Sequence, residues 1–148
     1  MRAIAGVAAA LAAGWAGAAA AEKITVTGEA MDTWCYFSGV MGAAEATLGT
    51  AHHTCAVWCA AGGIPVGLLA EDGTVYMILK IEDSDKTNGG DRLVTTASRQ
   101  LTATGEHYRR DGIDYIVIGE VVGDAGIVNL SHEDYGVTPG FAIPEPEE

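Results

Sequence analysis

The sequence predicts a mainly β protein: a small antiparallel barrel of five short strands, with a helical insertion between the first and second strands. Apolar and polar residues alternate in several short runs, as they do in half-buried strands. Two Asp-Gly steps lie between such runs and favour tight hairpins. The chain has 20 glycines in 148 residues, which suits the bends of a small closed barrel. This length is typical of one domain.

The expected strands lie on both sides of a segment of different composition. In the first, Ile24 and Val26 alternate with polar neighbours. The Asp-Gly turn at 72–73 joins the second and third strands, and the turn at 111–112 joins the last two. The five expected strands cover residues 23–32, 64–70, 74–81, part of 93–107, and 113–122.

The insertion covers residues 35–63 and is rich in Ala, Gly and Thr. Within it, residues 51–61 have a composition compatible with a helix. Thr50 is the expected N-cap, and Gly62-Gly63 is the expected end of this helix. Further along the chain, residues 82–92 are polar and rich in glycine and aspartate, which predicts a flexible loop.

Residues 1–21 are typical of a secretory signal peptide. A positive start is followed by a short run of Ala, Gly, Val, Leu and Ile that ends in four alanines. We therefore expect export to the periplasm or the extracellular space. The OB-like domain then covers residues 22–122, and residues 123–148 form an acidic tail that contains the last three prolines.

The charge excludes two classes of partner. With 8 Lys+Arg against 20 Asp+Glu, the formal net charge is −12. Such a chain cannot neutralise a row of phosphates, so sequence-independent binding to nucleic acid is excluded. The same balance argues against docking on an anionic membrane surface, and we expect no membrane contact once the signal peptide is removed.

Two phrases carry a resemblance to a known group of proteins. VTGEAMDTWCY resembles the first strand, and ATGEHYRRDGIDYIVIGEVV the final hairpin, of small secreted bacterial OB-fold proteins. The resemblance covers about half of the chain that follows the signal peptide. It implies a five-stranded OB-like barrel, to which this chain adds the insertion at 35–63. A fold shared by many functions says little about chemistry, so the site must be read from the residues.

All three cysteines and two of the four histidines lie in the insertion. On a helix, His52, Cys55 and Cys59 have the spacing i, i+3, i+7 and lie on one stripe. Cys35, at the exit of the first strand, is the remaining sulfur that can approach them. Together Cys35, His52, Cys55 and Cys59 form a nitrogen-and-sulfur set of the kind that binds soft metal ions.

Disulfide bonding is the ordinary alternative for cysteines in an exported protein. A bond from Cys35 to Cys55 or to Cys59 would leave one free thiol, because the number of cysteines is odd. A bond between Cys55 and Cys59 is disfavoured, since their Cβ atoms point nearly the same way from one helix. The spacing and the histidine on the same stripe favour the metal site.

The donor types suit copper and zinc, and the exported compartment and the softness of the donors favour copper slightly. Zinc accepts a set of three cysteines and one histidine, whereas copper(I) prefers thiolates with thioether neighbours. Met31 and Met41 flank Cys35, and Trp34 and Trp58 adjoin cysteines. We expect packing in the core for each of these four residues, although a tryptophan beside copper(I) would shield it. In fold and ligand type the chain resembles the small periplasmic copper and silver chaperones built on OB barrels.

Other polar residues have simpler expected roles. Asp32 is expected to cap the turn at the end of the first strand, with orientation of a ligand histidine as the alternative. His53 lies on a neighbouring stripe of the helix. His107 is expected to be a half-exposed strand residue, and His132 part of a solvated turn. The acidic residues of 82–91 lack the spacing of an EF-hand.

Three functions are compatible with these features. The first is an exported protein that binds copper or zinc through the Cys/His set and delivers it to a protein partner. The second is a thiol-redox or electron-transfer protein that uses the same cysteines. The third is a binding module, stapled by a disulfide, whose barrel face recognises a partner or a glycan. No common catalytic signature is present, which favours a protein without enzymatic activity but leaves a thiol-redox enzyme open.

Overall fold

The structure is a computed structural model that describes residues 21–82 and 89–130. The predicted signal peptide, apart from Ala21, lies outside the described residues, and so do most of the predicted tail and His132. None of the described helices has both the length and the apolar character needed to cross a membrane.

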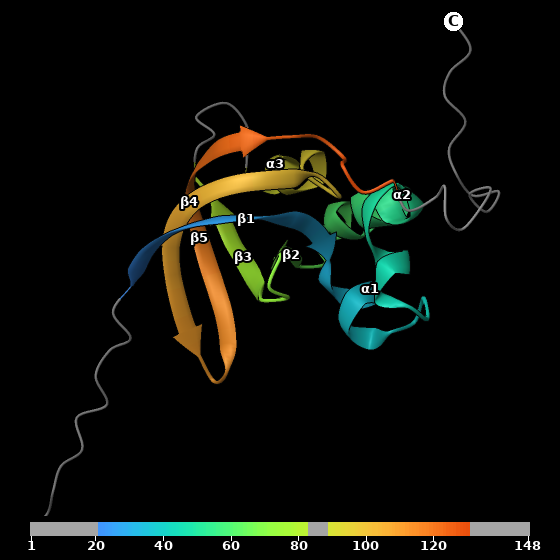
Figure 1. Cartoon of the computed structure of the whole chain (residues 1–148), viewed down its shortest axis with the longest axis horizontal. Coiled ribbons are helices and arrows are strands. Elements are labelled where there is room, and N and C mark those ends of the chain that lie inside the picture. Colours follow the sequence, from blue (N-terminus) through green and yellow to red (C-terminus); the bar gives the residue numbers. More distant parts are fainter. Residues whose placement is uncertain (1–20, 83–88, 131–148) are drawn as a thin grey trace, which may run out of the picture.

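Five strands close into a barrel, which confirms the predicted fold class (Figure 1). Their order around the barrel is β1-β2-β3-β5-β4, and β4 pairs with β1 to close it. A five-stranded barrel in which β5 lies between β3 and β4 is OB-like. The strands are β1 (Glu22–Asp32), β2 (Val66–Ala70), β3 (Val75–Ile81), β4 (Gln100–Arg110) and β5 (Ile113–Asp124).

One strand pair differs from the all-antiparallel expectation. Four pairs are antiparallel, but β3 and β5 run parallel, so the barrel is mixed. Asp-Gly hairpin signals predict the pairing of strands that follow one another in the sequence. The β3–β5 pair joins strands that are separated by β4, and no local signal reports it.

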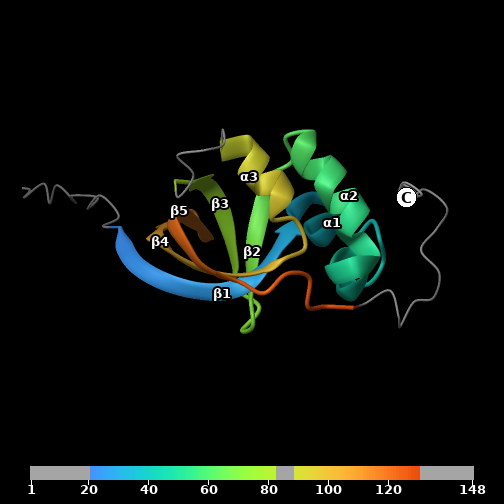
Figure 2. The same ribbon diagram turned by 90° about the horizontal axis from the view of Figure 1, so that it is seen from above.

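Strand β1 bends across the barrel and leads into the insertion. Its residues 22–29 pair with β4, and residues 28–32 pair with β2. At Gly28 the β2 backbone approaches so closely that a Cβ atom would overlap the Leu69 carbonyl group. The bend carries Asp32, the last residue of β1, to the end of the barrel where the helices lie (Figure 2).

Aliphatic side chains fill the barrel. Leu68, Leu101, Ile116 and Ile118 are fully buried and come from three different strands. Removing this apolar surface from water is the main contribution to the stability of a barrel of this size. The core therefore forms a rigid base for the helices at its end.

The insertion folds into three short helices, α1 (Thr33–Ser38), the 3₁₀ helix η1 (Ala44–Thr47) and α2 (Gly49–Ala61). A fourth helix, α3 (Gly89–Thr95), lies beside α2 (Figure 2). The prediction of a loop over 82–92 is therefore wrong for its last residues. Two glycines begin α3, so its sequence has a low helix propensity. Packing of Leu93 against the barrel core stabilises it.

The start of α2 differs from the prediction that Thr50 is its N-cap. The helix begins at Gly49, and Leu48 in the cap position offers no side-chain hydrogen bond to the helix. The Glu29 carboxylate of β1 accepts a 2.6 Å hydrogen bond from the Gly49 N–H. The Asn129 carbonyl accepts one of 2.9 Å from the Thr50 N–H. Both contacts provide acceptors for N–H groups of the first turn; the first attaches α2 to β1, and the second attaches it to the segment after β5.

Candidate metal centre

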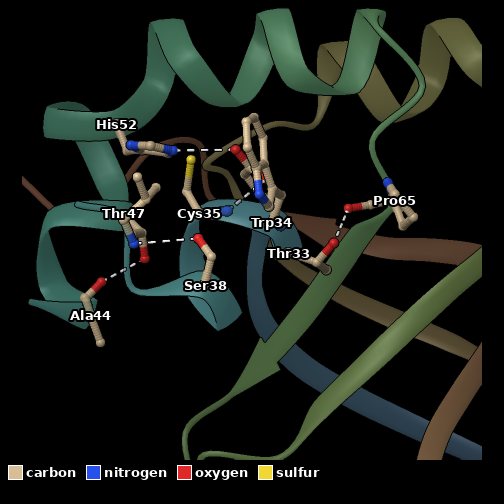
Figure 3. Close-up of polar contacts among 10 residues, drawn as sticks. Thr33, Trp34, Cys35, Ser38, Ala44, Thr47, His52 and Pro65 are labelled. Carbon is tan, nitrogen blue, oxygen red and sulfur yellow. Dashed lines mark hydrogen bonds and ion pairs between the residues drawn. The ribbon is translucent and has the colours of Figure 1, made fainter. Parts of the chain in front are cut away.

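Asp32 links β1 to α1 and fixes the position of Cys35. One carboxylate oxygen, Oδ1, accepts hydrogen bonds from the Trp34 N–H at 2.9 Å and the Cys35 N–H at 3.3 Å. This confirms the predicted capping role of Asp32. Because Cys35 lies in the first turn of α1, its sulfur points from that turn toward α2 and His52 (Figure 3). Both Asp32 and Cys35 are buried.

Helix α2 contributes the predicted stripe of His52, Cys55 and Cys59. His52 is only 1% exposed, and its Nε2 lies 3.4 Å from the second carboxylate oxygen of Asp32, Oδ2 (Figure 3). The other nitrogen, Nδ1, is buried and has no hydrogen-bond partner among the described residues. In the described part of the chain, Asp32 is thus the residue that orients the imidazole.

Four donor atoms converge on one point. The ligand atoms of Asp32, Cys35, His52 and Cys55 all lie within 4.8 Å of one another. This group can hold a metal ion. Three of its members were predicted from the sequence, and Asp32 is the fourth, in addition to its role as a helix cap.

The hydrogen bond between His52 and Asp32 is a long one. The 3.4 Å between His52 Nε2 and Asp32 Oδ2 exceeds the usual length of an N–H···O bond. Zinc bonds of about 2.0 to 2.1 Å to nitrogen and oxygen place two ligands of a tetrahedron about 3.3 Å apart. The imidazole and the carboxylate are therefore close enough to serve as two ligands of one metal ion.

Cys59 lies outside this group of four, although its thiol contacts both Asp32 and Cys55. The seven residues from His52 to Cys59 advance about 10 Å along the helix axis, so the two ends of the stripe lie far apart. Asp32, from another element, lies near both. Binding of an ion by Cys59 remains a prediction.

All three cysteines are free thiols in the structure. The Cys35 sulfur nevertheless lies within 4.8 Å of the Cys55 sulfur. The two sulfurs are thus close together, as both the metal-site hypothesis and the disulfide hypothesis require, and in the structure they are separate thiols. This arrangement is compatible with a bound metal ion.

The thiols of this cluster hold their protons more tightly than ordinary cysteines do. Burial raises the pKa of the Cys35 thiol to about 12, and the Asp32 carboxylate and Cys55 add to this effect. Burial and the same two neighbours also raise the pKa of Cys59. Burial alone would raise the pKa of Asp32, but hydrogen bonds from Cys59, Cys35 and His52 outweigh it and leave that pKa below its usual range. Asp32 is therefore the charged group of this cluster.

The remaining histidines have other surroundings. His53 is half-buried on α2 and is not a member of the group. His107, on β4, lies 2.8 Å from the Asp114 carboxylate on β5 and is half-buried, as expected for a strand residue.

The two methionines and two tryptophans near the cysteines differ in their exposure to solvent. Met31 is buried as expected, but Met41, Trp34 and Trp58 are exposed rather than packed in the core.

The role of Asp32 as a fourth donor had a weak signal in the sequence. Asp32 stands three residues before Cys35, and this spacing is typical of a helix cap. As a helix cap, the Asp32 carboxylate uses one oxygen, Oδ1, so the other oxygen, Oδ2, can face a side chain on a neighbouring helix. Only the packing of α2 against the end of β1 shows that this neighbour is His52.

No family model, no curated protein and no solved structure matches the chain.

Proposed function

We propose that this chain is an exported metal-binding protein that holds one zinc or copper ion for handling and delivery. The observation that carries the proposal is the convergence of Asp32, Cys35, His52 and Cys55 within 4.8 Å. These donors come from the end of a strand, a short helix and a second helix. Three of the four belong to the insertion, which makes the metal centre the specific addition to an otherwise simple barrel.

The donor set supports zinc over copper(I). Carboxylate, imidazole and two thiolates form a mixed set that zinc accepts in tetrahedral geometry. Copper(I) is softer and prefers sulfur and nitrogen, so a buried carboxylate oxygen in the group disfavours it. The charge points the same way, because two thiolates and one carboxylate are compensated better by a divalent than by a monovalent ion.

Export is supported by residues 1–21 of the sequence. In an oxidising compartment, neighbouring thiols tend to form disulfides. An ion bound to Cys35 and Cys55 would keep their sulfurs apart as separate ligands. A metal cargo thus accounts for a cysteine cluster in an exported protein without a disulfide.

The thiol-redox hypothesis has less support. Reactive thiols have a lowered pKa, because the thiolate is the nucleophile. Burial raises the pKa of Cys35 to about 12 and also raises that of Cys59. Without a metal these two thiols are protonated at neutral pH. Protonated thiols are poor nucleophiles, which disfavours disulfide exchange.

A direct experiment measures metal content and free thiols on protein purified from the exported fraction. We expect about one ion per chain and masked thiols in the wild type. Cys55→Ser removes one of the four donors and should lose most of the bound ion during purification, because three protein ligands hold it much less tightly than four. Unchanged metal content in Cys55→Ser overturns the proposal.

Metal affinity should depend on pH. The pKa of Cys35 near 12 means that its thiol carries a proton throughout the physiological range, and metal binding must displace it. Acidification adds protons that compete with the ion, so zinc affinity should fall by at least about tenfold per pH unit between about pH 8 and 6. Competition titrations with a chromophoric chelator at several pH values measure this slope. An affinity that does not change with pH would exclude Cys35 as a ligand.

A further inference from the structure

We infer that Cys35 and Cys55 form a redox modification site, whose reversible disulfide decides whether the protein can take up an ion. This inference rests on the proposed function and adds control to the same centre. The two residues lie 20 positions apart in the sequence, yet their sulfurs lie within 4.8 Å of each other. Cys59 lies outside the group that these sulfurs belong to. The fold thus selects one pair of thiols from the three cysteines.

Each sulfur of the pair belongs to an element with its own attachment to the barrel. Cys35 lies in the first turn of α1, which the Asp32 carboxylate caps, and its sulfur points toward α2 (Figure 3). Cys55 lies in the middle of α2, whose start is attached to β1 by the hydrogen bond from Gly49 to Glu29. A disulfide brings its sulfurs to about 2.05 Å. Closure therefore needs side-chain rotation and a small approach of the six-residue helix α1 to α2, while the barrel stays in place.

Burial sets the order in which the two thiols react. Cys35 is 3% exposed, whereas Cys55 is half-buried. A low-molecular-weight disulfide that arrives from solvent therefore reaches Cys55 first. Cys35 reacts second, with its target sulfur already beside it, and such proximity offsets the low nucleophilicity of a protonated thiol. The pair thus forms its bond within one chain rather than between chains.

The exchange balances in atoms and electrons. The Cys55 thiol loses its proton to water, and its sulfur attacks one sulfur of the external disulfide, whose S–S bond breaks. The Cys35 sulfur then loses its proton to water and attacks the Cys55 sulfur in the mixed disulfide. Each step releases one external thiolate, which takes up a proton. The pair gives up two electrons, and the external disulfide is reduced to two thiols.

The bond removes two of the four donors at once. The thiolate is the form of cysteine that binds metal, so only Asp32 and His52 of the group remain as ligands after oxidation. Two protein ligands hold zinc far less tightly than four. Because an ion that binds the reduced pair favours the reduced state, loading with zinc should in turn protect the two thiols from oxidation.

The test exposes the chelator-stripped wild type, Cys59→Ser and Cys35→Ser to oxidised glutathione. Intact mass and peptide mapping identify the bond, and chelator competition measures zinc affinity before and after oxidation. The wild type and Cys59→Ser should each form the Cys35–Cys55 bond. Zinc affinity of the wild type should fall at least 100-fold on oxidation and return on reduction, and zinc added first should slow oxidation at least tenfold. Cys35→Ser should form only a glutathione adduct at Cys55, and thermal unfolding verifies that each variant is folded.

The outcomes separate the two proposals. A reduced wild type that binds no zinc contradicts the proposed function, and control of uptake falls with it, whether or not the bond forms. Zinc binding together with a Cys55–Cys59 bond, or with glutathione adducts alone, overturns the inference and leaves the proposed function intact. Unchanged zinc affinity after the Cys35–Cys55 bond has formed, or equal rates of oxidation with and without zinc, has the same consequence.

Discussion

His52→Gln should weaken zinc binding by at least about 100-fold, whereas His53→Gln should change it by less than about threefold. His52 is 1% exposed, and its Nε2 belongs to the group of four donors. Glutamine keeps a polar side chain at the site but provides no imidazole nitrogen, which zinc prefers to an amide. His53 is the adjacent residue of the same helix and lies outside the group. Competition titrations on the two variants at one pH measure the difference.

This adjacent pair controls for effects on the helix. Both substitutions replace histidine by glutamine in the middle of α2, so they change helix propensity equally. Any difference between the two variants therefore reports the metal centre. Equal loss of affinity would mean that the centre is sensitive to the helix as a whole rather than to one imidazole. Equal retention would exclude His52 as a ligand.

Gly49→Ala should destabilise the protein by about 2 to 5 kcal/mol, which is the largest effect on stability that we expect from a single methyl group. Gly49 has φ +59°, a left-handed conformation that costs an L residue about 1 to 2 kcal/mol. A Cβ atom there would also overlap the Asn129 carbonyl group, and relief of such overlap costs about 1 to 3 kcal/mol more. Urea unfolding at equilibrium measures the change.

Gly39→Ala is the matched control. Gly39 caps the end of α1 with φ +65°, close to the value at Gly49, but no atom lies within 4 Å of a Cβ built there. This variant should therefore lose only the conformational part, about 1 to 2 kcal/mol. If both variants were equally stable, the contact of α2 with Asn129 would not be what holds the start of the helix.

Gly49→Ala should also weaken metal binding. The overlap with Asn129 displaces the first turn of α2, where Glu29 accepts the Gly49 N–H. His52 lies three residues further along, about one turn of the helix. A shift of this turn moves Nε2 relative to Asp32, whose position is set by the barrel. Zinc affinity measured on the folded variant tests the connection between the helix start and the centre.

The barrel could be predicted because its signals are local. Alternation in residues 23–32 and the Asp-Gly turns at 72–73 and 111–112 depend on neighbours along the chain. The parallel β3–β5 pair and helix α3 could not be predicted in the same way. The first joins distant strands, and the second is stabilised by packing of Leu93 rather than by its own propensity.

The candidate site was predicted in part for a related reason. Helical spacing places His52, Cys55 and Cys59 on one stripe, but residues on one stripe can still lie far apart along the helix axis. His52 and Cys55 are one turn apart and can share an ion with Cys35, whereas Cys59 lies two turns from His52. Asp32 completes the group because β1 ends beneath α2 (Figure 2), and this depends on the tertiary fold.

Zinc-edge X-ray absorption on the loaded wild-type protein tests the central claim most directly, because it reports the atoms bound to the ion. The group of Asp32, Cys35, His52 and Cys55 predicts two sulfur ligands at about 2.3 Å and two nitrogen or oxygen ligands at about 2.0 to 2.2 Å. A first shell that contains only nitrogen and oxygen would contradict this account.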